Sequence, residues 1–191
     1  MEPRVRKIED FNAEDRIEVT LLDNSVFFLT GDIEEENITE CIKWITYENL
    51  GARTDKILTL YINSQGGDLY QAFALIDIMN TSKRKIRTIG LGSIMSAAFL
   101  VFAAGSRGER YIGKNTGIMC HQFSDSQEGK YHDIKAQAKE NELCNARMVE
   151  ILKVATGLPN AKIKAKLLPA SDVYLTAHEL VEYGVADFIL D

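Results

Sequence analysis

A serine and a histidine that end two apolar segments are the residues of this chain best suited to covalent chemistry. Ser96 lies between a β-branched stretch that ends in Gly90 and Gly92 and the apolar run at residues 97–104. These patterns predict a strand, a tight turn and a buried helix, with the hydroxyl at the helix N-terminus. Free N–H groups there can stabilise a developing oxyanion, as acyl transfer requires. Alternatively, Ser96 only caps the helix, a common role for serine.

A base for this serine must be one of three histidines, His121, His132 and His178. His121 follows the apolar residues 118–120, where a predicted strand leaves the sheet, whereas the other two lie in polar helical patterns. A histidine at a strand end is commonly structural, but beside a serine it is the usual general base. We therefore predict His121 as the base. Spacing alone does not identify the carboxylate that would orient it, and Asp172 is one candidate.

Two adjacent glycines, Gly66 and Gly67, separate the predicted strand at residues 57–62 from a predicted helix that Asp68 opens. Glycine permits positive φ and close approach of the backbone. An N–H group of this turn could form half of an oxyanion hole, and the N–H of Ala97 the other half. A Gly-Gly pair by itself is commonly a plain turn. Neither phosphate-binding pattern, GxGxxG or GxxxxGK[ST], occurs.

The composition indicates a soluble, single-domain protein of 191 residues, with 46% hydrophobic and 26% charged residues. A net charge of −6 argues against nucleic-acid binding. The longest apolar run is far shorter than the ~18 residues that a membrane span needs, and the N-terminus lacks the apolar core of a secretory signal. Three cysteines without metal-ligand spacing favour a reducing compartment. We expect a cytoplasmic location.

Alternating strand and helix patterns predict an α/β fold with parallel crossovers. Residues 1–16 are charged and without periodicity, which predicts a mobile N-terminal arm, and residues 17–191 form the single domain. Residues 131–156 predict one long helix closed by Gly157, and a helix of this length is expected to project from a compact body. Further strands are predicted at residues 26–31, 57–62, 110–112, 117–121, 172–175 and 185–190, and further helices at 38–45, 68–79, 161–168 and 176–184.

Together these motifs resemble the ClpP family of ATP-dependent caseinolytic proteases. The resemblance covers about residue 17 to the C-terminus, and its motifs come in the family's order. It is carried by Phe28-Leu-Thr-Gly31, Leu60-Tyr-Ile-Asn-Ser-Gln-Gly-Gly67, Ser96 with Phe99-Leu100, Met119-Cys-His-Gln122, residues 129–157, Asp172-Val-Tyr-Leu-Thr-Ala177 and Val181-Glu-Tyr-Gly184.

The resemblance implies a set of catalytic roles. Ser96 would be the nucleophile, His121 the base and Asp172 the orienting acid of a serine endopeptidase. The backbone N–H groups of Gly67 and Ala97 would be the oxyanion donors.

The resemblance also implies a ClpP/crotonase-like ββα-repeat fold in which residues 131–156 form a protruding handle helix. Handles interlock two heptameric rings into a tetradecameric barrel. Such barrels receive unfolded polypeptides from a Clp-family AAA+ ATPase and release short peptides. The partner uses the ATP, so neither a cofactor nor a metal is expected in this chain, and neither nucleic acid nor a membrane is an expected partner.

The sequence departs from the family pattern at several positions. Gln65 replaces a proline, residues 122–128 replace the Gly-rich run by which rings grip each other, and Ala170-Ser171 replaces an acid–arginine pair. Three other interpretations remain open: a non-catalytic ring subunit that modulates an active partner, a crotonase-type acyl-CoA enzyme, and a capsid-maturation protease of similar fold.

Overall fold

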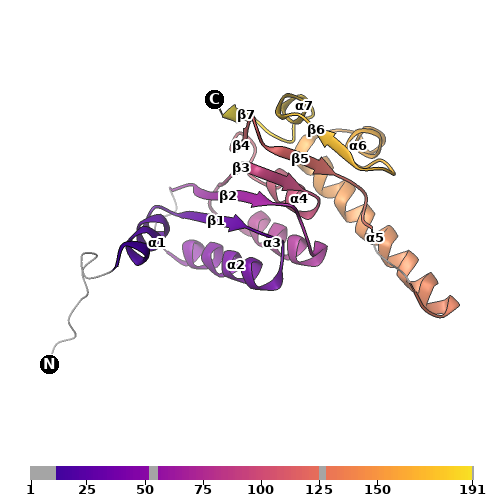
Figure 1. The fold of residues 1–191 in the computed structure, drawn as a ribbon, viewed down its shortest axis with the longest axis horizontal. Helices are drawn as coiled ribbons and strands as arrows, with labels where there is room; N and C mark the ends of the chain where they lie inside the picture. Colours follow the sequence, from indigo (N-terminus) through magenta and orange to yellow (C-terminus); the bar gives the residue numbers. More distant parts are fainter. Residues whose placement is uncertain (1–11, 52–55, 125–127, 191) are drawn as a thin grey trace.

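The computed structural model describes residues 12–51, 56–124 and 128–190 as an α/β fold (Figure 1). Seven strands in these ranges form one sheet with the order β1-β2-β3-β4-β7, in which β5 also pairs with β3, and β6 with β5. The strands are β1 (Val26–Thr30), β2 (Leu58–Ser64), β3 (Ile86–Met95), β4 (Arg110–Gly113), β5 (Gly117–Cys120), β6 (Val173–Leu175) and β7 (Phe188–Leu190). The helices are α1 (Ala13–Asp23), α2 (Glu35–Leu50), α3 (Leu69–Thr81), α4 (Ala97–Ala103), α5 (Tyr131–Thr156), α6 (Asn160–Lys166) and α7 (Ala177–Glu182).

The long strand β3 serves two parts of the sheet. Its residues 88–90 pair in parallel with β4, and its residues 93–95 pair in parallel with β5. Strand β6 then adds to β5 in the antiparallel sense. The second half of β3, which leads to Ser96, is therefore held beside β5, which leads to His121.

A local irregularity separates the two halves of β3. The register between β2 and β3 shifts between Ile62 and Ser64. Asn63 supplies the missing bonds, because its Oδ1 accepts from the Ser93 N–H at 3.0 Å and from the Ser93 hydroxyl at 3.2 Å. Gly92 has a φ of +64°, and a Cβ there would lie 2.5 Å from Asn63 Oδ1. The bulge redirects β3 toward the site, a common use of bulges.

Helices α2 to α5 cover one face of the sheet (Figure 1). Leu58, Leu60 and Ile62 of β2 are buried beneath them, whereas Thr59 and Tyr61 face the other way and are half-buried. Every residue of α4 is buried, which explains its uniformly apolar sequence. Burial of α4 fixes the helix that begins directly after Ser96.

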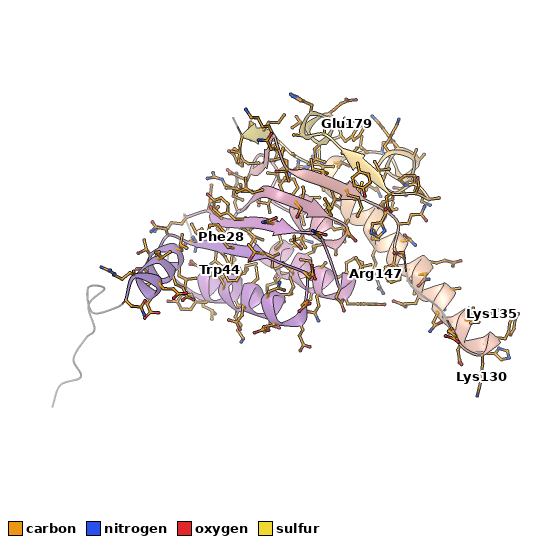
Figure 2. All side chains as sticks on the ribbon, in the orientation of Figure 1. Phe28, Trp44, Lys130, Lys135, Arg147 and Glu179 are labelled. Carbon is orange, nitrogen blue, oxygen red and sulfur yellow. The ribbon has the colours of Figure 1, made fainter. Side chains whose placement is uncertain are left out.

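The predicted long helix is confirmed as α5, and Gly157 ends it in the left-handed conformation with a φ of +74°. Residues 131–136 are exposed, whereas Cys144, Met148 and Leu152 are buried. Figure 2 shows Lys130 and Lys135 at the end of the helix that lies away from the body, and Arg147 close to the body. The helix therefore projects as predicted. None of the helices in the described ranges is both long enough and apolar enough to cross a membrane.

Helix α1 begins at Ala13, inside the segment predicted as an N-terminal arm at residues 1–16. Asn12 caps this helix by accepting the Asp15 N–H at 2.9 Å, and Glu14 and Asp15 lie in its first turn. Such caps and acidic first turns stabilise a helix without apolar periodicity, and α1 contains no buried residue. Residues 1–11 lie outside the described residues, as do residues 125–127 of the altered 122–128 segment.

Candidate active site

Ser96 occupies a strained turn between β3 and α4. Its φ of +52° and ψ of −122° are uncommon for a residue with a side chain and cost about 1–3 kcal/mol. The Ser96 N–H donates to the Met119 carbonyl at 2.9 Å. On the other side, a Cβ added to Gly66 would lie 2.7 Å from Ser96 Cβ and 2.8 Å from the Met95 carbonyl oxygen. Neighbouring backbone therefore holds the serine in place, as in nucleophile turns between a strand and a helix.

The Ser96 hydroxyl points to His121 rather than to the start of α4. Its Oγ lies 2.8 Å from His121 Nε2, and Ser96 makes no side-chain capping bond. The interpretation of Ser96 as a plain helix cap is therefore wrong. The structure brings together the residues predicted as nucleophile and base, and both are half-buried. His132 and His178 are exposed.

The hydrogen-bond partner of Nδ1, the second ring nitrogen of His121, shows which tautomer is present. Nδ1 is hydrogen-bonded to the backbone carbonyl of Gln122. A carbonyl oxygen only accepts, so Nδ1 carries a proton, and in the neutral ring Nε2 is then free to accept the Ser96 hydroxyl proton. This is the tautomer that a general base for Ser96 requires.

Asp172 directly precedes β6, the strand that pairs with β5. The β5–β6 ladder ends with Cys120 opposite Val173, so one further step places His121 opposite Asp172. Asp172 is exposed. Within the described ranges no hydrogen bond joins its carboxylate to the imidazole, whose Nδ1 contacts Gln122 instead. The ladder thus leads toward a position of the Asp172 backbone opposite His121, and no hydrogen bond pairs the two side chains in the described residues.

Of the two predicted oxyanion donors, the Gly67 N–H belongs to the Gly66-Gly67 turn and the Ala97 N–H lies beside this turn. A Cβ on Gly66 would lie 3.1 Å from the Ala97 nitrogen, so the turn contacts the start of α4. Ile33 holds the turn, because its N–H donates to the Gly66 carbonyl at 2.7 Å and its carbonyl accepts the Asp68 N–H at 2.8 Å. In the part of the chain that the structure describes, neither the Gly67 nor the Ala97 N–H has an acceptor. Both remain available to an anion.

A comparison with known protein families identifies the family of this chain. The sequence model of the Clp protease family matches residues 10–191. The chain belongs to the Clp protease family. This is a peptidase family, so the resemblance inferred from the motifs is confirmed at the level of the family, and the α/β fold with its projecting helix is consistent with it.

In this Clp-family chain a cavity of about 520 Å³ opens beside the glycine turn. The backbone of Gly66 and Gly67 forms part of its wall, and Asp32, Glu34 and Asp68 lie around it. Of the two predicted oxyanion donors, only Gly67 lines this cavity, and it is exposed to solvent.

The cysteines are poor alternatives to Ser96 as nucleophile. All three are free and buried. Burial raises the pKa of Cys120 to about 12 and raises the pKa of Cys41 further, so both thiols stay protonated near neutral pH. Among the described residues, no cluster of three or more His, Cys, Asp or Glu side chains is arranged to hold a metal ion.

Sequence reasoning missed the groups that hold the segment after His121. The Gln122 carbonyl accepts from the imidazole, and the Gln122 side chain donates from Nε2 to the Leu168 carbonyl at 3.0 Å. The next N–H, of Phe123, donates to Asn145 Oδ1 at 2.9 Å. Every residue carries a main-chain carbonyl, so the sequence does not indicate that the carbonyl of Gln122 is the acceptor. In the sequence, Asn145 cannot be distinguished from the other polar residues of the long helix.

Proposed function

We propose that this Clp-family chain is a serine endopeptidase that uses Ser96 as nucleophile, His121 as general base and Asp172 as the acid. The observation that carries the proposal is the 2.8 Å contact between Ser96 Oγ and His121 Nε2, in the tautomer that the Gln122 carbonyl selects. Serine–histidine pairs of this geometry are the activated nucleophiles of acyl transfer.

In the proposed reaction, Ser96 Oγ attacks the carbonyl carbon of the scissile peptide while its proton moves to His121 Nε2. The negative charge on the substrate oxygen is stabilised by the N–H groups of Gly67 and Ala97. His121 then gives the proton from Nε2 to the leaving amine nitrogen, the C–N bond breaks, and an acyl-Ser96 ester remains. Water attacks this ester while His121 takes its proton, and transfer of that proton back to Ser96 Oγ releases the acid product.

We assign to Asp172 the role of stabilising the His121 imidazolium that forms in these steps. It lies opposite His121, one step beyond the last pair of the β5–β6 ladder. An ionised carboxylate stabilises imidazolium more strongly than a neutral carbonyl does. A turn of this exposed side chain toward Nδ1 would let the carboxylate share the Nδ1 proton with the Gln122 carbonyl, which stays in place.

The proposal extends to assembly in a self-compartmentalised barrel. Membership of the family and the exposed first half of α5 support handle helices that interlock two heptameric rings into a tetradecamer. Unfolded polypeptides enter the barrel and leave as short peptides, so enclosure supplies the specificity. We place the protein in the cytoplasm, with neither a cofactor nor a metal of its own.

A Clp-family AAA+ ATPase is the proposed partner that consumes ATP and delivers substrate. The sheet face away from the helices carries stacked aromatic pairs, Phe28 on Tyr61 at 4.7 Å and Tyr111 on Phe188 at 5.0 Å between centroids. Phe28 and Phe188 are about half exposed, at 48% and 49%. Exposed apolar surface of this kind commonly marks a protein interaction site.

Reaction with a fluorophosphonate, followed by intact-mass analysis and peptide mapping, tests the proposed chemistry. We expect one adduct per chain on Ser96, no adduct in Ser96→Ala, and much slower labelling in His121→Ala. A non-catalytic ring subunit would assemble into a large particle, shown by sedimentation, and give no adduct. That result, or an adduct on another serine, would overturn the proposal.

A further inference from the structure

A single peptide group joins His121 to the handle helix. This group lies between Gln122 and Phe123. Its carbonyl accepts from His121 Nδ1, and its N–H donates to Asn145 Oδ1 on α5 at 2.9 Å. The C=O and N–H of a trans peptide point in opposite directions, so the group is held at one end by the imidazole and at the other by the asparagine.

The side chain of Asn145 is itself held in one orientation. Its Nδ2 donates to the backbone carbonyl of Asn141, one helical turn earlier, at 2.9 Å. The amide nitrogen only donates and the amide oxygen only accepts, so this bond leaves Oδ1 directed at the Phe123 N–H. Asn145 therefore presents a fixed acceptor to the peptide.

This part of α5 is fastened to the body of the molecule. Cys144, the neighbour of Asn145, is completely buried. The Tyr70 hydroxyl of α3 donates to Glu140 of α5, and the guanidinium of Arg147 lies 5.8 Å from the Phe73 ring centroid. Asn145 thus lies on the anchored half of the handle helix rather than on its projecting half.

We propose that Asn145 is a positioning residue for His121 and acts through the peptide between Gln122 and Phe123. Holding the N–H end of this peptide keeps its carbonyl aimed at Nδ1, which maintains the tautomer and the ring orientation that the base needs. If the peptide rotates, Nδ1 loses its acceptor and fewer molecules present Nε2 to Ser96. This inference rests on the proposed serine endopeptidase function.

Four variants compared with the wild type test the inference. Asn145→Ala and Asn145→Leu both remove the acceptor, and the second nearly keeps the side-chain volume. Asn145→Asp keeps an acceptor oxygen. Asn141→Ala is the matched control on the same helix face, because it keeps the backbone carbonyl that Asn145 uses. Each is measured for kcat and KM on a fluorogenic peptide, for the rate of fluorophosphonate labelling of Ser96, and for particle size and Tm.

We expect Asn145→Ala and Asn145→Leu to lower kcat and the labelling rate about tenfold, the rate equivalent of one ordinary hydrogen bond, with KM unchanged. Asn145→Asp should recover most of this loss, and Asn141→Ala should match the wild type. Assembly is measured for every variant. The rates of the alanine or leucine variant are interpreted only where that variant forms particles of the wild-type size.

Three results would overturn the inference. Wild-type rates in the assembled alanine or leucine variant would show that Asn145 does not position His121, while the proposed function would stand. An equal loss in an assembled Asn145→Asp would show that packing, not the acceptor, matters. A wild type that neither hydrolyses peptides nor labels at Ser96 would overturn the proposed function itself, and the inference with it.

Discussion

The two sides of the candidate site are held in different ways. On the side of Ser96, backbone packs against backbone, and Gly66 has no room for a Cβ beside Ser96. The backbone N–H and carbonyl of Ile33 both form hydrogen bonds with the glycine turn and the residue after it. On the side of His121, the strand ends at Cys120 and the following segment depends on separate hydrogen bonds. The nucleophile is fixed by the fold, whereas the base is fixed by contacts that single substitutions can remove.

Removing the nucleophile should give the largest effect. We expect Ser96→Ala to lower peptide hydrolysis by at least ~10³-fold, since no other group supplies the attacking oxygen. Particle size should be unchanged, because the hydroxyl bonds only to His121 in the described part of the chain. Ser171→Ala, an exposed serine, is the control. Retained hydrolysis in Ser96→Ala would contradict the proposed role.

A buried ion pair holds β4 and β7 together, and β4 pairs with β3, the strand that leads to Ser96. Arg110 is 3% exposed and donates from Nε and Nη2 to both carboxylate oxygens of Asp187 at 2.9 and 2.7 Å. Asp187→Asn should reduce the free energy of unfolding by about 3 kcal/mol, since it leaves the guanidinium buried without a counter-charge. Denaturant unfolding at pH 7 measures this loss. The exposed Glu150–Lys153 pair is the control, and Glu150→Gln should cost well under 1 kcal/mol.

The same ion pair predicts a pH dependence of stability. Burial raises the pKa of Asp187, but hydrogen bonds from Arg110 and Gly108 outweigh it and hold this pKa below its usual value. The stabilisation is therefore present above the unfolded-state pKa of about 3.9 and is lost as the pH falls through the lower folded-state pKa. The difference between wild type and Asp187→Asn should shrink in that acid range. A difference that stays constant down to the acid transition would contradict the role of the pair.

Crowding the glycine turn tests whether the nucleophile side is as rigid as its contacts indicate. Gly66→Ala would place a Cβ 2.8 Å from the Met95 carbonyl oxygen at a φ of +106°, so the backbone beside Ser96 must move. A displacement near 1 Å costs about 100-fold in rate, and we expect that loss in kcat/KM. Gly108→Ala has a φ of +82° but no atom within 4 Å, so it carries the backbone strain without the crowding. Equal activity of these two variants would show that the close contact is not important.

The smallest effect is expected on the side of the base. Gln122→Ala removes the bond from Gln122 Nε2 to the Leu168 carbonyl but leaves the backbone carbonyl that accepts from His121. We expect about a threefold lower kcat, because the peptide after Gln122 is still held by Asn145. A loss as large as that of Gly66→Ala would mean that the two sides are equally rigid.

The sequence predicted those parts of the fold that local patterns determine. The bounds of α5 follow from an uninterrupted helical stretch closed by Gly157, and the start of α4 after Ser96 follows from its apolar run. The tight turn predicted at Gly90 and Gly92 is wrong, because β3 continues through both glycines to Met95. The start of α1 was missed because a polar cap, not apolar periodicity, stabilises it.

The pairing of Ser96 with His121 depends on long-range register. It requires β5 to lie beside the second half of β3, which no local pattern shows. The prediction of His121 rested on the scarcity of histidines and on its place at a strand end, and the family resemblance implied the same residue. The Gln122 carbonyl could not be predicted because every residue carries one. The role of Asp172 stays a prediction, since no hydrogen bond joins its carboxylate to His121 in the described part of the chain.

The structure of the Ser96 fluorophosphonate adduct, determined on the assembled particle, would show whether the nucleophile and its oxyanion donors are preformed. We expect the phosphonyl oxygen to lie within about 3 Å of the N–H groups of Gly67 and Ala97, with the glycine turn unchanged and Nδ1 of His121 still bonded to a carbonyl or carboxylate oxygen. A phosphonyl oxygen directed away from both N–H groups, or a glycine turn that must rebuild to reach it, would contradict a preformed nucleophile site.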